Sequence, residues 1–234
     1  MFLINPYILQ ASGNPLWDGL LAYYTADNTP NDALGTYNGT LVNGATYGTG
    51  IINNGFSFDG VNDYVDLGNV LDNDGTSAFS ISAWVYINNG TGSKSILSKI
   101  KASSPFNGFD LFVSNRALHG YIGANSLTDG VYRYTFSTAI TVSTWCHCVM
   151  TYDGSKTAAG MKLYVNNVDS SSIQIDNFTG TSSNAFTTNI GARESGAGSF
   201  MNGLIDEVGV WNRELTSTEV TELYNSGAAK QYPN

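Results

Sequence analysis

The segments GFSFDGVNDYVDL (residues 55–67) and FMNGLIDEVGVWNREL (residues 200–215) decide the fold of this chain. Each joins the apolar–polar alternation of a β-strand to a carboxylate that the alternation places among apolar neighbours. Three further segments, residues 79–87, 145–154 and 162–166, lie between them and also have the pattern of strands. The five segments therefore predict strands of one all-β protein.

The composition agrees with many short strands joined by tight turns. Of the 234 residues, 26 are glycine, while 12% are charged and 12% are aromatic. A chain of this length can bury a sizeable core, and all-β sandwiches of this size commonly form one domain. We predict an N-terminal docking arm over residues 1–15 and a single domain over residues 16–234.

A helix signal lies near the C-terminus. Thr216 can cap a helix, and Glu219 can reach back to it in a capping box. Val220 and Leu223 supply an apolar stripe, and Gly227 supplies a stop. These signals predict one helix of about two turns.

In this order and spacing, the five strand segments resemble the laminin G-like, concanavalin A-like jelly-roll family, which also includes the pentraxins. The resemblance extends from about Gly19 to about Gly227. It implies an all-β, two-sheet antiparallel jelly-roll sandwich with one short C-terminal helix. Members of this family mostly bind glycans or proteins.

The net charge limits the possible binding partners, and the spacing of the two cysteines argues against a disulfide. The formal net charge of −9 argues against nucleic acid, which binds to clustered Lys and Arg, and favours cations or neutral sugars. No apolar stretch approaches the roughly 18 to 20 residues needed to span a membrane. Cys146 and Cys148 share one face of a predicted strand, so we expect two buried thiols and no disulfide.

Asp206 is the first candidate for a metal ligand. Alternation places it on one strand face with Leu204, Val208 and Val210. A carboxylate among apolar neighbours needs a partner. That partner is either a Ca²⁺ ion, shared with a turn carbonyl or another carboxylate, or a set of backbone N–H groups and a hydroxyl.

A second candidate calcium site combines two loops. Asn62 and Asp63 lie in one turn and Glu194 in a distant loop, and Ca²⁺ takes six to eight oxygen ligands of this kind. The resemblance to pentraxins implies a calcium site at these loops. Here the second loop has one carboxylate with Arg193 beside it, so we expect at most one ion. Turn residues that cap a hairpin are the alternative.

The sequence predicts no catalytic machinery. Glycoside hydrolysis needs two carboxylates at a defined separation. Asp206 and Glu207 are adjacent, and alternation sends adjacent side chains to opposite faces of a strand. His119 and His147 lie in no nucleophile motif, so we interpret both as hydrogen-bonded structural residues.

Aromatic side chains that alternation turns away from the core are candidates for ligand binding. They are Trp84, Tyr86, Tyr132, Tyr134 and Tyr164. Such rings can stack on sugars with weak affinity, which multivalency strengthens. Packing against a covering loop or a neighbouring subunit is the alternative.

The N-terminal residues suggest docking onto a larger protein assembly. The run is apolar, has no Lys or Arg before it and is interrupted by Pro6, so it makes a poor secretory signal. We expect the assembly contacts to come from Phe2, Leu3, Ile4, Tyr7, Ile8 and Leu9. This favours a bacteriophage virion surface protein, in a tail or capsid, that carries a lectin-like domain for glycan or host-surface adhesion. The alternatives are a secreted bacterial carbohydrate-binding or adhesion domain and, third, a glycan hydrolase or lyase.

Overall fold

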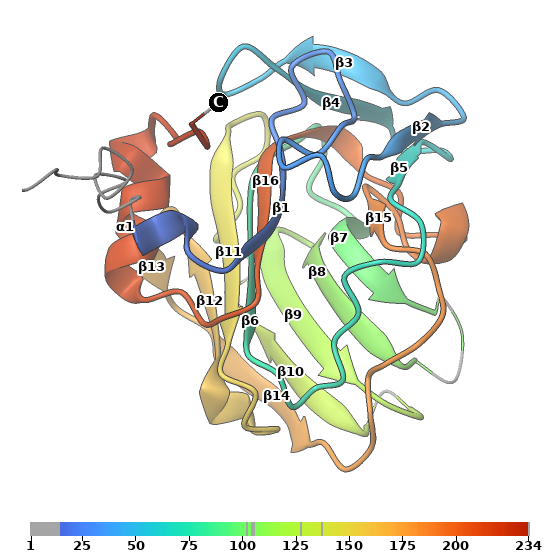
Figure 1. The fold of residues 1–234 in the computed structure, drawn as a ribbon, viewed down its shortest axis with the longest axis vertical. Helices are drawn as coiled ribbons and strands as arrows, with labels where there is room; N and C mark the ends of the chain where they lie inside the picture. Colours follow the sequence, from blue (N-terminus) through green and yellow to red (C-terminus); the bar gives the residue numbers. More distant parts are fainter. Residues whose placement is uncertain (1–14, 102, 104–105, 127, 137, 234) are drawn as a thin grey trace, which may run out of the picture.

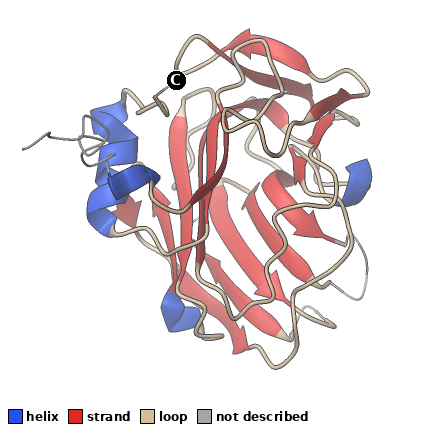
Figure 2. Cartoon of the chain, in the orientation of Figure 1, coloured by secondary structure: helices blue, strands red, loops and turns tan. Residues whose placement is uncertain are grey.

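Two β-sheets make up the body of the protein (Figure 1). The computed structural model describes residues 15–233 except 102, 104–105, 127 and 137. Within these residues each sheet has eight strands, and all strand pairs are antiparallel. Strands dominate and helices are few and short (Figure 2). The predicted two-sheet antiparallel jelly-roll sandwich is confirmed.

The strand order defines sheet A and sheet B. Sheet A runs β13 (Val168–Asp169), β12 (Met161–Val165), β11 (Cys146–Tyr152), β6 (Phe79–Ile87), β16 (Asn202–Trp211), β4 (Asn54–Asp59) and β3 (Thr46–Thr49), with β1 (Leu20–Tyr24) also paired to β16. Sheet B runs β14 (Ser172–Asn177), β10 (Gly130–Tyr134), β9 (Ala117–Gly123), β8 (Gly108–Ser114), β7 (Ser93–Ile100), β15 (Asn189–Ile190), β5 (Tyr64–Asp66) and β2 (Thr40–Val42). Short 3-10 turns are η2 (Pro15–Trp17), η3 (Ala158–Gly160), η4 (Glu194–Gly196) and η5 (Asn225–Gly227).

The main core fills the space between the two sheets. The alternation predicted for residues 79–87 holds, since every second side chain from Phe79 onward belongs to this core. Ile81 of sheet A and Leu111 of sheet B are both fully buried in it. Cys146 and Cys148 are free thiols buried in the same cluster, as predicted.

Helix α1 (Ser217–Tyr224) begins with the predicted capping box. The Glu219 N–H donates to Thr216 Oγ1 over 3.3 Å, and the Thr216 N–H donates to Glu219 Oε2 over 2.8 Å. The helix ends earlier than predicted. Asn225 adopts a left-handed φ of 46° and terminates it two residues before Gly227, because Asn tolerates this conformation better than most residues.

Helix α1 and turn η2 cover the outer face of sheet A (Figure 1). They complete a second buried cluster, formed by Leu16, Val149, Tyr164, Trp211, Leu215, Val220 and Leu223. The indole N–H of Trp211 donates to the Leu16 carbonyl over 2.8 Å, which ties η2 to the last strand. Sheet A is therefore packed on both faces.

A bulge in β16 corrects one predicted strand face. The pairing of β16 with β6 shifts register after Asp206, and Glu207 has a φ of 50°. Asp206 lies opposite Trp84, away from the core, whereas Val208 and Val210 belong to the core. The prediction that Asp206 shares a face with those two valines is wrong, because an extra residue in one strand reverses the alternation beyond it.

The predicted docking residues lie outside the part of the chain that the structure describes. All six belong to residues 1–14, so their role in assembly stays a prediction, as does the boundary between arm and domain. Across the described residues, no helix is long and apolar enough to cross a membrane.

Candidate functional site

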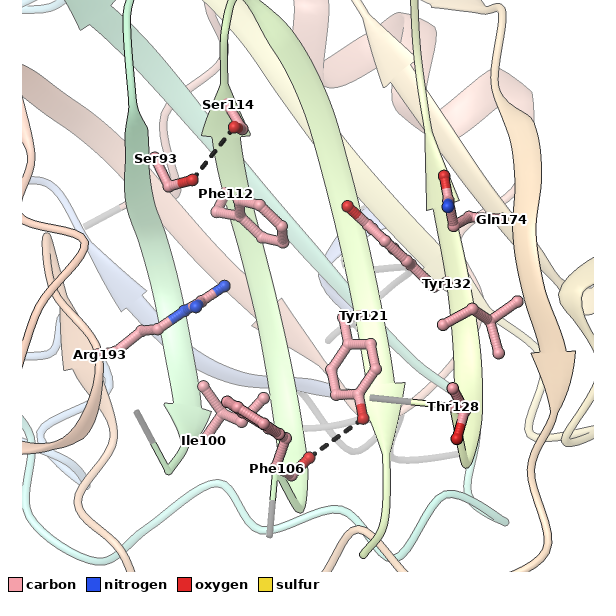
Figure 3. Close-up of a pocket in the computed structure, with 11 residues that line it drawn as sticks. Ser93, Ile100, Phe106, Phe112, Ser114, Tyr121, Thr128, Tyr132, Gln174 and Arg193 are labelled. Carbon is pink, nitrogen blue, oxygen red and sulfur yellow. Dashed lines mark hydrogen bonds between the residues drawn. The ribbon is translucent and has the colours of Figure 1, made fainter. Parts of the chain in front are cut away.

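A groove of about 440 Å³ lies on the outer face of sheet B, the face turned away from the core (Figure 3). Its rings are those of Phe106, Phe112, Tyr121 and Tyr132, and its other lining residues are Ser93, Ile100, Ser114, Thr128, Gln174, Ile175 and Arg193. Among these described lining residues, Arg193 is the one charged side chain. The site is mostly apolar with a few polar groups, which is the usual character of a ligand pocket.

Alternation along β8 explains why these side chains face outward. Phe109, Leu111 and Val113 point into the core between the sheets. Asp110 and Phe112 occupy the intervening positions and therefore point to the opposite face. Phe112 belongs to a separate, smaller cluster on that face.

Cross-strand pairing assembles the floor of the groove from three neighbouring strands. One ladder consists of Asp110, Tyr121 and Tyr132, and the next of Phe112, His119 and Tyr134. The ring centroids of Phe112 and His119 lie 4.7 Å apart, and those of His119 and Tyr134 lie 5.8 Å apart, both stacked. Tyr121 and Tyr132 meet edge to face at 6.1 Å. Each ring supports its neighbour, so the floor is fixed before a ligand arrives.

His119 holds the Tyr132 ring in place. Its Nδ1 lies 2.7 Å from the Tyr132 hydroxyl. Burial lowers the pKa of His119 to about 4, so the ring is neutral near pH 7 and its Nδ1 can accept a hydrogen bond from the hydroxyl. His147 likewise lies 2.8 Å from the Ser82 hydroxyl, and burial lowers its pKa to about 3. Both histidines are hydrogen-bonded, as predicted.

Arg193 reaches the groove from the loop between β15 and η4. Its Nε donates to Asp110 Oδ2 over 2.6 Å, and its guanidinium carbon lies 4.9 Å from the Phe112 ring centre. Asp110 is fully buried and also accepts from the Ser95 hydroxyl over 3.0 Å. Asp110 raises the pKa of Arg193, while burial raises the pKa of Asp110. The guanidinium is therefore held in one orientation by a charge below it and a ring beside it.

The predicted aromatic residues divide between the two sheets. Tyr132 lines the groove, and Tyr134 stands beside it through His119. Trp84 and Tyr164 point away from the core as predicted, but only 2% and 6% of their surfaces are exposed. Neither offers a ring face to a sugar in this structure, because the layer formed by α1 and η2 covers them.

Tyr86 is half-buried on sheet A. Its ring lies 5.7 Å from that of Trp145, centre to centre, at a tilted angle. Tyr86 does not line the groove on sheet B. Of the five predicted ligand-binding rings, Tyr132 and Tyr134 are thus the two that lie together on an uncovered sheet face.

The roles of Phe112, Tyr121 and Arg193 in the groove were not predicted from the sequence. Phe112 and Tyr121 alternate with core residues in β8 and β9, so a period of two in these segments would have found them. Arg193 gave no such signal. It comes from a loop, and its partner Asp110 lies 83 residues earlier in the chain.

Asp206 finds its partner in backbone N–H groups. Its Oδ2 accepts from Ile51 over 2.9 Å and from Ile52 over 3.2 Å, and its Oδ1 accepts from Glu207 over 2.8 Å. Burial and the charge of Glu207 raise the pKa of Asp206 to about 8, against the effect of these three bonds. These three hydrogen bonds agree with the alternative to Ca²⁺, in which backbone N–H groups bind the Asp206 carboxylate.

Asp206 and Glu207 both lie away from the core, so the predicted opposite faces are wrong. Glu207 accepts from the Tyr23 hydroxyl and, over 2.9 Å, from the Gln231 amide. The Tyr23 ring meets the ring of Trp17 edge to face, and Trp17 belongs to turn η2 on the outer face of sheet A. The bulge turns both carboxylates to one face. They are 0% and 3% exposed, and burial raises the pKa of Glu207 to about 7.

Two groups of the first predicted calcium loop already accept hydrogen bonds within the protein. Asp63 is buried, and its Oδ2 accepts from the Asp59 N–H over 3.0 Å. The Asn62 carbonyl accepts from the Asn43 side chain over 2.8 Å. Glu194 begins the short turn η4. Within the described residues, no group of three or more His, Cys, Asp or Glu could hold a metal ion.

The chain belongs to the concanavalin A-like lectin/glucanases superfamily, whose Laminin_G_3 model matches residues 59–221. The resemblance inferred from the sequence is thereby confirmed. No curated protein sequence gives a significant match.

Solved structures with low sequence identity share this fold. Domain 4 of AbnA, an extracellular arabinanase of Geobacillus stearothermophilus solved with arabinotriose, is 20% identical with a TM-score of 0.65, over 90% of this chain and 98% of that domain. The binding domain of Paraclostridial Mosquitocidal Protein 1 is 16% identical with a TM-score of 0.70, over 91% of this chain and 53% of that one. The binding domain of botulinum neurotoxin DC, solved with rat synaptotagmin II, is 17% identical with a TM-score of 0.67, over 90% and 52%. The chain spans about half the length of these two toxin domains.

Proposed function

We propose that this protein is a non-catalytic, lectin-like domain that binds carbohydrate in the groove on sheet B. The observation that carries the proposal is the fixed aromatic floor, in which Tyr132 is partly exposed and presents its ring beside polar groups, while buried Phe112 packs next to it. Sugars offer apolar ring faces for stacking and hydroxyls for hydrogen bonds, so a floor of rings with a polar rim suits them. The arabinanase domain of the same fold, solved with arabinotriose, supports a sugar as ligand.

The polar rim matches this chemistry. Gln174, Thr128 and two serines lie around the rings (Figure 3). Ser93 and Ser114 already share a hydrogen bond of 3.1 Å, which leaves their remaining donor and acceptor capacity for a ligand. The volume of about 440 Å³ falls within the usual range for small-molecule sites.

The placement of the carboxylates supports binding without turnover. Glycoside hydrolysis needs two carboxyl groups at the scissile bond. Asp110, beneath Arg193, is fully buried and ion-paired. Asp206 and Glu207 are buried on the other sheet. The described lining of the groove therefore lacks the pair that the reaction requires.

A glycan array followed by titration calorimetry tests the proposal. We expect Tyr132→Ala to weaken sugar binding by about twofold to tenfold, since an aromatic contact contributes about 0.5 to 1.5 kcal/mol beyond area burial. Tyr86→Ala, a half-buried ring on sheet A, is the matched control and should bind as the wild type does. Equal loss in both variants, or no loss in Tyr132→Ala, would overturn the assignment of the groove.

Absence of turnover is tested on the same sugars. A polysaccharide panel should yield no new reducing ends or unsaturated products after incubation with the protein. Turnover that a single Asp or Glu substitution abolishes would show that the protein is an enzyme.

The setting of the domain is a separate part of the proposal. Display on a virion surface rests on the apolar residues 2–9, which suit docking onto a larger assembly. A secreted or cell-surface domain is the alternative, and the extracellular origin of the arabinanase supports it. Mass measurement of the native particle separates the two, because the first requires a large assembly.

A further inference from the structure

Arg193 has more hydrogen-bond donors than its protein partners use. A guanidinium carries five N–H donors in a planar fork. Among the described residues, its one hydrogen bond runs from Nε to Asp110. The other nitrogens lie at the edge of the groove beside Phe112 (Figure 3). The side chain keeps 22% of its surface exposed, so this edge is open to a ligand.

The guanidinium is positioned in advance. Asp110 fixes Nε from below, and Ser95 fixes Asp110 in turn. Phe112 supports the flat face of the group at 4.9 Å. An ionic group that is already ordered loses little entropy when it binds a ligand, so its hydrogen bonds add to affinity.

We propose that the groove selects sugars that carry a carboxylate, such as uronic acids, and that the terminal nitrogens of Arg193 bind that carboxylate while the sugar ring lies on Tyr132. This inference rests on the proposed function and names its ligand class. A planar fork pairs with a carboxylate through two parallel hydrogen bonds, a geometry that one hydroxyl cannot match. The overall charge of −9 favours neutral sugars, yet the charge that faces the groove is positive.

The ion pair with Asp110 limits how much negative charge the site accepts. The buried carboxylate offsets the charge of Arg193, so the groove suits a single carboxylate on a sugar. A densely sulfated chain would meet a protein of net charge −9, with Arg193 as the one cation in the described lining of the groove. We therefore expect short uronic-acid oligomers to bind and heparin-like chains not to compete.

The decisive experiment changes the ligand and leaves the protein intact. Calorimetry compares trigalacturonate, its methyl ester and the neutral galactose trimer. We expect the acid to bind at least about tenfold tighter than its ester, because hydrogen bonds to charged groups are worth about 1.5 kcal/mol or more. An ester that binds as tightly as the acid overturns the inference.

Variants assign the effect to Arg193. Arg193→Gln should remove the preference for the acid over the ester, and Arg193→Lys should keep only part of it. Since Arg193→Gln leaves Asp110 buried without a cation, the double variant Asp110→Asn/Arg193→Gln repeats the test with the ion pair removed. Tyr132→Ala is the control and should weaken acid and ester equally. A preference that survives in the double variant overturns the inference.

The outcomes separate this inference from the proposed function. If the neutral trimer binds in the groove and the acid does not, the carbohydrate function stands and the carboxylate preference falls. If neither the acid nor any sugar on the array binds, both fall. If the acid binds tighter than the ester and Arg193→Gln abolishes the difference, both are supported.

Discussion

The outer faces of the two sheets carry similar aromatic residues, but the face of sheet A is covered and the face of sheet B forms an open groove. On sheet A, the Trp84 ring stacks against His147 at 5.1 Å and against Tyr224 of α1 at 5.8 Å, and 2% of the Trp84 surface is exposed. On sheet B, Tyr132 lies over His119 and Tyr121 and lines an open groove. Both are strand aromatics that point away from the core. The covering layer decides which ring stabilises the fold and which one can meet a ligand.

The carboxylates follow the same division. Asp206 and Glu207 on sheet A are buried and satisfied by backbone and side-chain donors. Asp110 on sheet B is equally buried, yet it holds an arginine whose far edge faces the groove. A buried acid therefore supports the fold on one face and positions a candidate ligand-binding cation on the other.

The largest effect should come from removing a ring on the covered face. We expect Trp84→Ala to lower the free energy of unfolding by about 3 to 5 kcal/mol, because it leaves a cavity beneath α1. Chemical denaturation measures the change. Tyr132→Ala, the matched variant on the open face, should cost far less stability while it reduces sugar binding. If the two variants lose equal stability, the faces do not differ in the way described.

The buried acid pair on sheet A predicts a specific dependence of stability on pH. The folded-state pKa values of Asp206 and Glu207 are raised to about 8 and about 7 by burial, above their ordinary values of 3.8 and 4.5. The contribution of the pair is therefore fully present below about pH 4 and is lost as the pH rises through 7 to 8. We expect the melting temperature to fall between pH 5 and pH 9 and to fall less in Glu207→Gln.

The comparison with Glu207→Gln isolates the pair from other titrating groups. His119 and His147 have lowered pKa values, so their contribution is lost as the pH falls below about 6.5, the opposite direction. Both histidines are present in the variant and cancel in the difference. A difference between wild type and variant that does not change with pH would contradict the prediction.

Local pattern predicted much of the fold and less of the site. The period of two in residues 79–87 and the capping box at Thr216 and Glu219 depend on neighbours in sequence, and both were correct. The faces of Asp206 and Glu207 were wrong because a bulge is a property of the paired strands and gives no signal in one strand alone. The role of Arg193 in the groove was not predicted, because its ion pair with Asp110 is a contact between distant segments.

A smaller effect concerns the calcium hypothesis for Asn62, Asp63 and Glu194. An ion that binds only the folded state raises its stability, by about 1.4 kcal/mol at ten times the dissociation constant. If calcium binds there, millimolar Ca²⁺ added to metal-free protein should raise the melting temperature, and a chelator should reverse the change. Asp63→Asn should abolish the response and Asp206→Asn should not, because Asp206 already accepts three backbone N–H groups. If calcium does not change the melting temperature, the calcium hypothesis is wrong.

The smallest expected change in stability follows removal of residues 1–12. The described sandwich is anchored at Pro15–Trp17, where Trp17 stacks on Trp211 at 6.3 Å and the Leu16 carbonyl accepts the Trp211 indole N–H. These contacts remain after the deletion, so we expect the free energy of unfolding to change by no more than about 0.5 kcal/mol, as for changes away from such packing. Sugar binding on sheet B should also be unchanged, whereas association with a larger assembly should be lost if residues 2–9 dock. Calorimetry and mass measurement of the truncated protein check both statements. If the truncated protein unfolds, the N-terminal residues are part of the folded domain. If it assembles as the full chain does, the docking hypothesis is wrong.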